Sequence, residues 1–282
     1  MTYQSENTLL HFTSAKNAAL ILGTSTINFG SLGNSNDLSE NPRLLDSLVL
    51  MCDAKPEGVA GDLLTRAQLV REIQSMGFIC LSEFTAYKDN VTGDLLFHEP
   101  DKFELMMGHY ASKGQGICLM FDKLKFIEEL KYRGNDAEFH AIKHDKIEYK
   151  NSGGVWDLST ISDYRDLASG ENLGRLFIKR EVWEYENEYR VLRVPHLKKP
   201  QSEIPLGVTF DKEALIGFAY CTLGYDAYPW TAEVQMYIDA CKHSKYQPAE
   251  YEFSPYSREK KGGMEYIKRG RFRKRKIKHV KL

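Results

Sequence analysis

Residues 9–30 read LLHFTSAKNAALILGTSTINFG, and this stretch decides the class of fold. Leu9–Phe12 predicts a short strand. Ser14 is placed to cap a helix running to Leu22, because its hydroxyl can accept hydrogen bonds from the unpaired N–H groups of the first turn. Thr24–Gly30 alternates β-branched and other residues, which predicts a second strand. Strand and helix signals this close together indicate that both kinds of element share one core.

The same signals continue along the chain. Strands are predicted at Phe78–Phe84, Gly116–Phe121, Phe139–Tyr149, Glu188–Val194 and Ala214–Thr222. Helices are predicted at Arg43–Cys52, Gly61–Met76, Asp101–Ser112, Leu124–Tyr132, Ser159–Lys179 and Ala232–His243. Because strands and helices do not alternate regularly, we expect an α+β fold with a mixed or antiparallel central sheet and surrounding helices.

Composition describes an ordinary globular protein, with 42% hydrophobic and 27% charged residues among 282. No Pro/Gly/Ser linker divides the body, so we expect one catalytic-type domain at 1–257 and a basic arm at 258–282. The five cysteines are scattered without a CxxC pair, which is typical of free thiols in a reducing compartment. The chain shows no secretory signal pattern and no apolar run near the roughly 20 residues of a membrane span. We therefore expect a cytoplasmic protein that does not enter a membrane.

The C-terminal arm carries a strong positive charge. Residues 258–282 contain 12 Lys and Arg against two acids, a balance of +10, which leaves −11 on the rest because the whole chain carries −1. Such asymmetry is typical of contact with a polyanion, and nucleic acid is the partner we favour. The arm could instead fold back on the acidic body or bind a protein; a membrane surface is disfavoured because the arm lacks a broad apolar face. The candidate nucleic-acid-binding residues are Lys268, Arg269, Arg271, Arg273, Lys274, Arg275 and Lys276.

Three short segments hold polar residues beside predicted strands. His11 ends the first strand, where its ring and the neighbouring amides could meet a ligand or simply occupy a surface turn. Ser82 follows Cys80 at an interval of two, so both share one face of a strand. Tyr110, beside His109, ends a predicted helix before a glycine-containing turn, where it could meet a ligand or pack under the turn.

The segment KREVWEYENEYR at 179–190 is the most informative. If a strand starts near Glu186, then Glu186, Glu188 and Arg190 share a face and form a charged stripe. Buried carboxylates are costly unless they are paired, so Arg190 is expected to pair with one of them and leave the other available. A solvent-facing edge strand with cross-strand ion pairs explains the same spacing.

Common catalytic and metal-binding motifs are absent. The sequence has no P-loop, GxGxxG, GxSxG or HExxH pattern. His140 and His144 are spaced to share a face, but no suitably spaced thiol or carboxylate completes a site, so no metal is expected there.

Three of these segments together resemble an uncharacterised bacterial domain family of unknown function. The resembling motifs are the Cys-x-Ser-Glu strand at Cys80–Glu83, the His-Tyr-Ala block within Met107–Phe121 and the Lys-x(3)-Trp-x(2)-Glu-x-Glu-Tyr-Arg segment at Lys179–Arg190. The resemblance covers roughly Leu9 to Phe218 and excludes the arm. Met107 stands where the family usually has Trp, and the family's Phe-Asn-Asp-Pro loop survives only as Ser35–Leu38.

The opening segment and the Glu-x-Glu pair are also similar to nucleic-acid-modifying ADP-ribosyltransferases. This resemblance implies an ADP-ribosyltransferase-like fold, NAD as a substrate, Glu188 as the catalytic carboxylate and Glu186 as the residue that orients the acceptor. It also implies that His11, Phe12, Thr13, Ser82 and Tyr110 bind the dinucleotide. A carboxylate beside the ribose would stabilise the positive charge that develops when the glycosidic bond of NAD breaks.

The function expected from the sequence is therefore an enzyme of the glycosyltransferase class. It would transfer ADP-ribose from NAD to nucleic acid, RNA before DNA, as a toxin or phage-defence effector that an antitoxin or chaperone partner would accompany. Two alternatives stay open: a nuclease that holds a divalent metal with Glu186 and Glu188, and a non-catalytic nucleic-acid-binding module with a structural Glu/Arg stripe.

Overall fold

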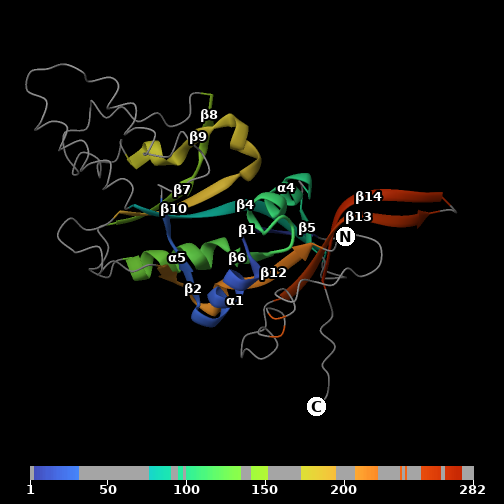
Figure 1. Cartoon of the computed structure of the whole chain (residues 1–282), viewed down its shortest axis with the longest axis horizontal. Helices are drawn as coiled ribbons and strands as arrows, with labels where there is room; N and C mark the ends of the chain where they lie inside the picture. Colours follow the sequence, from blue (N-terminus) through green and yellow to red (C-terminus); the bar gives the residue numbers. More distant parts are fainter. Residues whose placement is uncertain are drawn as a thin grey trace, which may run out of the picture. The chain divides into compact units, whose positions relative to one another are not determined.

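A computed structural model of the chain describes residues 3–31, 76–89, 95–97, 100–134, 141–151, 173–194, 207–221, 236, 239, 249–261 and 264–274. The fold is mixed α/β with a mainly antiparallel central sheet and few helices among these residues (Figure 1). The chain divides into two compact units. Unit 1 comprises Met1–Ile27, Leu81–Leu130 and Thr209–Leu282, and unit 2 comprises Asn28–Cys80 and Lys131–Val208.

The sheet of unit 1 is built around β1 (Tyr3–Thr13) and β6 (Ile117–Asp122). Strands lie in the order β14 (Met264–Lys274), β13 (Ala249–Lys261), β12 (Leu215–Cys221), β6, β1 and β4 (Gly77–Asp89), with β5 (Leu95–Phe97) also paired to β4. All these pairs are antiparallel except β12 with β13, which is parallel. Residues 117–121 of β6 are all buried, as expected for an apolar run covered on both faces. The strand predicted at Gly116–Phe121 is confirmed.

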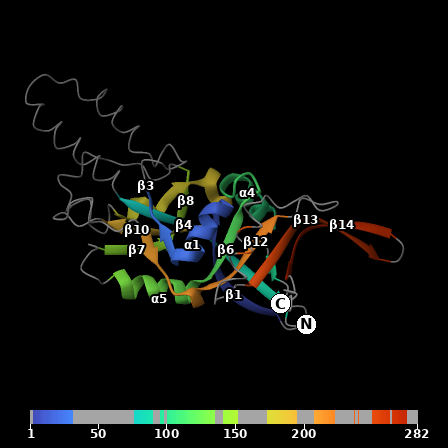
Figure 2. The ribbon, with the colours of Figure 1, turned by 60° about the horizontal axis from the view of Figure 1, so that its bottom comes forward.

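Helix α1 (Ala15–Thr24) begins where the sequence places it. The Ser14 side chain accepts a hydrogen bond from the backbone N–H of Asn17 at 3.2 Å, which confirms the predicted cap. Buried residues at Ala15, Ala18 and Leu22 recur at helical intervals and form its inner face, and the helix contacts β6 (Figure 2).

Two further helices complete the described part of unit 1. Helix α4 is Pro100–Tyr110 and α5 is Lys123–Gly134. The helix predicted from Asp101 begins one residue earlier, at Pro100, because the missing N–H of a proline has no helical partner to lose at the first position. Aromatic rings fill the core between α5 and the sheet, with the centroid of Phe121 lying 5.0 Å from those of both Phe126 and Phe210.

Unit 2 contains the antiparallel pair β7 (Ala141–Lys146) and β10 (Glu188–Val194) and the parallel pair β8 (Glu148–Lys150) and β9 (Ile178–Arg180). Two 3-10 helices flank β9: η3 (Arg175–Phe177) and η4 (Glu181–Glu186). The short strand β3 (Gly30–Ser31) pairs with Gly77 and Phe78 at the start of β4.

Two short strands lie where the chain passes from one unit to the other: β2 (Thr26–Asn28) and β11 (Gly207–Thr209). The 3-10 helix η6 (Lys212–Ala214) belongs to unit 1.

Several predictions need correction. The strand expected at Thr24–Gly30 is broken, because α1 continues to Thr24, Ser25 adopts a left-handed conformation (φ 52°) and β2 starts only at Thr26. The strand expected at Phe139–Tyr149 is two strands, β7 and β8, joined at the buried Ile147. Lys179, expected at the end of a helix, lies in β9.

Some predictions lie outside the described residues. These are the helix at Arg43–Cys52, residues 61–75 of the next predicted helix, most of Ser159–Lys179 and nearly all of Ala232–His243.

In the part of the chain that the structure describes, no helix is both long and apolar enough to cross a lipid bilayer.

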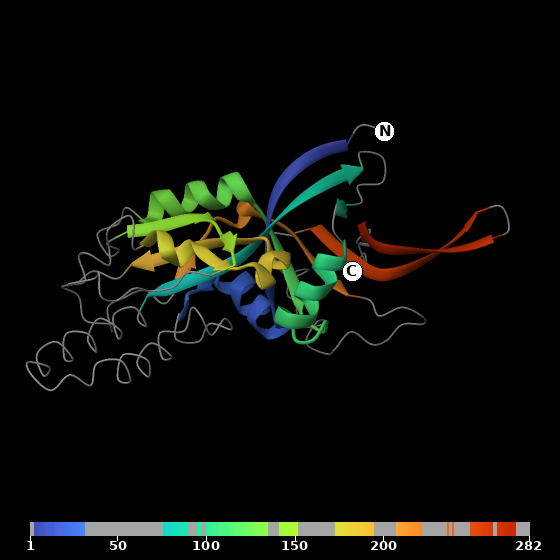
Figure 3. The ribbon, with the colours of Figure 1, turned by 90° about the horizontal axis from the view of Figure 1, so that it is seen from above.

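The strands β13 and β14 form a long antiparallel ribbon that extends past the other strands of unit 1 (Figure 3). Ten residue pairs, from Tyr251 with Lys274 to Lys261 with Met264, keep one constant register. Residues 258–261 of the basic arm belong to β13 and residues 264–274 to β14, so this part of the arm is paired strand. Helix α4 and strand β5 contact the ribbon.

Candidate functional site

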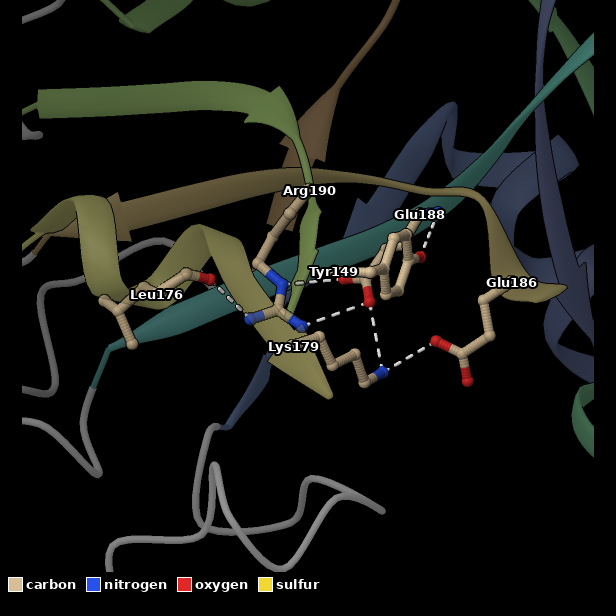
Figure 4. A network of polar contacts seen from close by, with 6 residues as sticks. All are labelled: Tyr149, Leu176, Lys179, Glu186, Glu188 and Arg190. Atoms are coloured by element: carbon tan, nitrogen blue, oxygen red, sulfur yellow. Dashed lines mark hydrogen bonds and ion pairs between the residues drawn. The ribbon is translucent and has the colours of Figure 1, made fainter. Parts of the chain in front are cut away.

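Four charged side chains of unit 2 meet in a buried network (Figure 4). Lys179 of β9 places its Nζ 2.7 Å from Oε2 of Glu186 and 3.2 Å from Oε2 of Glu188. Arg190 of β10 donates from Nε to Oε1 of Glu188 at 2.6 Å and from Nη2 to Oε2 at 3.1 Å. Two carboxylates and two cations therefore balance each other in the interior.

A local turn of the backbone brings these residues together. Helix η4 ends at Glu186, and Asn187 follows in a left-handed conformation (φ 44°, ψ 49°) with its N–H bonded to the carbonyl of Glu184. Asparagine tolerates this conformation better than most residues. The stripe predicted on one strand is thus corrected: Glu188 and Arg190 share a face of β10, whereas Glu186 belongs to the helix and reaches the network from the other side of the turn.

The network is not a solvent-facing edge, so the alternative of a surface stripe is wrong. Glu188 is 2% exposed and Arg190 is 1% exposed. The third guanidinium nitrogen, Nη1, donates to the carbonyl of Leu176 at 2.6 Å, and the ring of Phe78 lies 5.4 Å from the guanidinium carbon. Arginine suits this position because its planar fork matches a carboxylate in two parallel hydrogen bonds.

Both Glu186 and Glu188 are paired with a cation. We expected Arg190 to leave the other carboxylate available, and this expectation is wrong because Lys179 contacts Glu186 as well as Glu188. The ammonium of Lys179 also lies 5.1 Å from the ring centroid of Trp183, which is a cation–π distance. Lys179 belongs to the sequence motif, but its spacing from Glu186 gave no reason to predict a contact between the two side chains.

The charges of the network determine the ionisation of Glu188. Burial alone would raise the pKa of this carboxyl, but the positive charges of Arg190 and Lys179 and hydrogen bonds from Arg190 and Cys80 outweigh burial and lower its pKa to about 2. Glu188 is therefore ionised at neutral pH. Burial and the adjacent negative charge of Glu188 raise the pKa of the Cys80 thiol, which makes Cys80 a hydrogen-bond donor rather than a thiolate nucleophile.

Tyr149 of β8 contacts the backbone of Glu188. Its hydroxyl oxygen accepts the backbone N–H of Glu188 at 2.8 Å, while Glu188 also accepts the N–H of Ile147 at its carbonyl. Burial raises the pKa of Tyr149, so its hydroxyl stays protonated. Sequence reasoning missed Tyr149 and the hydrogen bond of Cys80, because neither lies near Glu188 in the chain.

The hydrogen-bond capacity of Glu188 is filled. An ionised carboxylate offers about four acceptor sites. Those of Glu188 meet two nitrogens of Arg190, the ammonium of Lys179 and the thiol of Cys80. Any ligand hydroxyl that bonds to Glu188 must displace one of these donors, and Lys179 at 3.2 Å is the longest of the charged contacts.

The residues predicted to bind the dinucleotide all belong to unit 1, whereas Glu186 and Glu188 belong to unit 2. His11, Phe12 and Thr13 end β1, opposite Leu119, Cys118 and Ile117 of β6. Phe12 is 8% exposed and its ring lies 5.3 Å from that of Phe103, so it is a core residue.

Ser82 and Tyr110, the other two residues predicted to bind the dinucleotide, lie on β4 and at the end of α4. Ser82, on β4, is 2% exposed and pairs in register with Leu10. Tyr110 is the last residue of α4, and its ring lies 6.1 Å from that of His109. The glycine turn expected after them is confirmed, with Gly114 at φ 83°.

The candidate nucleic-acid-binding residues fall on β14. Lys268, Arg269, Arg271, Arg273 and Lys274 are all part of this strand, and their partners on β13 are Ser257, Tyr256, Ser254, Glu252 and Tyr251. Arg275 and Lys276 lie outside the described residues. As for metal binding, the described residues hold no group of three or more His, Cys, Asp or Glu side chains that could bind an ion.

Comparison with known proteins gives one match. Residues 106–191 match the model of a family described as "Protein of unknown function (DUF2971)". The match includes the end of α4, β6, Tyr149 and three motif residues of the network, Lys179, Glu186 and Glu188, together with Arg190. No curated protein and no solved structure matches the chain significantly. The similarity to an uncharacterised domain family is thus supported, over a range shorter than the sequence motifs suggested.

Proposed function

We propose that this protein binds nucleic acid through the β13–β14 ribbon. The observation that carries the proposal is the placement of five basic residues within the eleven residues of β14, which is paired along its length with β13. Strand pairing holds the backbone of these residues at regular intervals, and an ordered backbone loses less entropy when it meets a phosphate chain. Each Lys or Arg that neutralises a phosphate also releases counterions.

Fluorescence anisotropy with a labelled 20-base-pair duplex and a labelled 20-nucleotide single strand tests this proposal. We expect binding that weakens steeply between 50 and 200 mM salt, because each neutralised phosphate releases condensed counterions. A control chain carries Gln in place of Lys123 and Lys125 of α5, so it loses two cations that lie outside the ribbon. Affinity that is absent for every nucleic acid, or insensitive to salt, contradicts the proposal.

A second candidate concerns chemistry: transfer of ADP-ribose from NAD to the bound nucleic acid. The supporting observation is the pairing of Glu186 with Glu188 around one ammonium, with Glu188 ionised because its pKa is lowered to about 2. A carboxylate that stays negative at neutral pH can stabilise the oxocarbenium-like ribose that forms as nicotinamide leaves. In this reaction the glycosidic C–N bond breaks, nicotinamide departs with the bonding electrons, and a nucleophile of the nucleic acid forms the new bond to the ribose.

Because the acceptor sites of Glu188 are filled, ADP-ribose transfer requires that one of its hydrogen-bond donors be displaced. A ribose hydroxyl must take the place of Lys179, so that NAD binding and the Lys179–Glu188 contact exclude each other.

Incubation with NAD labelled on its adenine ring, followed by counting of label in nucleic acid and in protein, tests the transfer. We expect label in nucleic acid for the natural chain and none for Glu188→Gln. Glu184→Gln is the control, because Glu184 is an exposed acid of the same helix η4. Circular dichroism melting of each variant separates lost chemistry from lost folding. If the natural chain labels neither nucleic acid nor protein, ADP-ribosyl transfer is wrong, while nucleic-acid binding stands or falls by the anisotropy result.

A further inference from the structure

The ribbon has two chemically different faces. Because the register is constant and strand residues alternate between faces, residues 252, 254, 256, 258 and 260 of β13 share a face with residues 265, 267, 269, 271 and 273 of β14. We call this the arginine face. It holds five basic residues and two acids, and its basic residues are Arg258, Lys260, Arg269, Arg271 and Arg273.

The opposite positions form what we call the aromatic face. It includes Tyr251, Phe253, Tyr266 and Phe272, with Phe253 and Phe272 directly paired, and it holds three lysines, Lys261, Lys268 and Lys274. Its first residue is already covered: Tyr251 is 4% exposed, and a Cβ placed on Gly217 of β12 would lie 2.9 Å from the Tyr251 ring. The aromatic face is therefore covered at its first position, beside Gly217 of the neighbouring strand β12.

We propose that the arginine face of β13–β14 docks on double-stranded DNA, with Arg269, Arg271 and Arg273 contacting successive phosphates or base edges of one groove. This inference rests on the proposed function and names its substrate class. It differs from the RNA expected from the sequence.

The dimensions of the ribbon favour a B-form duplex. Residues two apart on a strand are about 6.8 Å apart, so the three arginines span about 14 Å, which corresponds to roughly four base pairs at 3.4 Å each. Two paired strands lie about 4.8 Å apart, and the major groove of B-DNA, about 12 Å wide, admits a two-stranded ribbon. Arginine is also the side chain that bonds phosphate or guanine in two parallel hydrogen bonds.

Other nucleic acids fit this surface less well. The major groove of A-form RNA is deep and too narrow for side chains to read. Single strands bind through bases stacked on aromatic rings, and four of the ribbon's five aromatic residues, all but Tyr256, lie on the aromatic face. A single-stranded ligand would thus depend on the aromatic face, and this dependence separates the two ligand classes in an experiment.

Two charge-matched variants test the proposal. One changes Arg269, Arg271 and Arg273 to Gln, and the other changes Lys261, Lys268 and Lys274 to Gln. Each removes three positive charges from the same ribbon, but from opposite faces. Anisotropy of a labelled 20-base-pair DNA duplex is measured over 50–300 mM salt for both variants and for the natural chain, and thermal melting confirms that each variant folds.

We expect the arginine variant to lose roughly 500-fold in affinity at 0.1 M salt and to lower the salt slope by about 2.7, because each lost phosphate contact removes about 0.9 from the slope. The lysine variant should lose less than about tenfold, since its charges act only through the long-range field. Equal losses in both variants, or a larger loss in the lysine variant, overturn the face assignment.

A competition experiment uses only the natural chain, so its result does not depend on whether a variant folds. Unlabelled DNA duplex, RNA duplex and single-stranded RNA compete against the labelled DNA duplex, and we expect the DNA duplex to compete at least tenfold better than either RNA. Better competition by RNA overturns the duplex-DNA inference while leaving nucleic-acid binding intact. Failure of all ligands to bind contradicts the proposed function itself.

Discussion

Replacement of Lys179 by Met is the most direct test of the buried network. Methionine keeps much of the length and apolar volume of lysine but removes the ammonium. Its Nζ lies 2.7 Å from a Glu186 oxygen and 3.2 Å from a Glu188 oxygen, and the three side chains are 6%, 4% and 2% exposed. The variant therefore removes one of the two cations that neutralise the interior carboxylates of Glu186 and Glu188.

The expected cost follows from these distances. At an effective dielectric constant of about 20, each contact contributes roughly 5–6 kcal/mol of Coulombic attraction, much of which the desolvation of the ions offsets. Removal of one partner from a buried ion pair typically costs about 3–5 kcal/mol, because the other charge stays buried without compensation. We expect Lys179→Met to lower the free energy of unfolding by that amount at pH 7.

The cost should shrink as the pH falls. Without the ammonium, burial raises the folded-state pKa of the less compensated acid, so the folded variant gains a proton below that pKa. A raised folded pKa contributes stability at low pH that is lost as pH rises. The natural chain changes little over the same interval, because the pKa of Glu188 is already lowered to about 2. The gap between the two proteins should therefore narrow from pH 7 to pH 5.

Urea unfolding followed by circular dichroism at pH 7 and pH 5 measures the gap. Lys150→Met is the matched control, since Lys150 lies 2.9 Å from Glu148 but the two side chains are 45% and 63% exposed. A surface pair of this kind contributes about 0–1 kcal/mol. The reasoning is refuted if Lys179→Met costs no more than Lys150→Met, or if its cost does not depend on pH.

Three further predictions concern local features of the fold. Gly116→Ala should destabilise the protein by about 2 kcal/mol or more in urea unfolding, because the new Cβ would lie 2.3 Å from the carbonyl oxygen of Thr13. The control is Gly108→Ala on α4, whose new Cβ would meet nothing within 4 Å; it should be neutral or stabilise the protein by about 0.5–1 kcal/mol. Ser14→Ala should cost about 1 kcal/mol by losing the cap of α1, and Ser14→Asp should retain it; equal melting temperatures of the natural and alanine chains would argue against the cap. The stability that Glu188 contributes is present above its ordinary pKa of 4.5 and should be lost as pH falls toward its folded pKa of about 2, an effect of up to about 3 kcal/mol; acid titration of Glu188→Gln should lack this component, and an identical acid transition in both proteins would contradict the assignment.

Much of the local structure follows from short sequence patterns. The buried run of β6, the Ser14 cap of α1 and the glycine turn after Tyr110 depend on residues within a few positions of each other. Propensity, capping and alternation act over that range. The breaks at Ser25 and Asn187 escaped prediction because a left-handed residue outside glycine leaves little mark in the pattern.

The candidate site, in contrast, depends mostly on contacts between residues far apart in the sequence. Spacing alone paired Glu188 with Arg190, and that contact is present. Spacing did not reveal that Lys179 contacts both acids, that Cys80 hydrogen-bonds to the Glu188 carboxylate, or that Tyr149 accepts the backbone N–H of Glu188. These partners come from other strands, so only the packing of β4, β8, β9 and β10 brings them within hydrogen-bonding distance.

The sequence by itself determined the charge asymmetry of the chain and the residue types of the Glu-x-Glu segment, because both are properties of composition and order. Only the tertiary structure decided that this segment is buried and neutralised, and that the basic residues at 264–274 alternate along a paired ribbon. Burial and strand register depend on contacts between residues far apart in the chain, and those contacts set the cost of each charge and the face on which it lies.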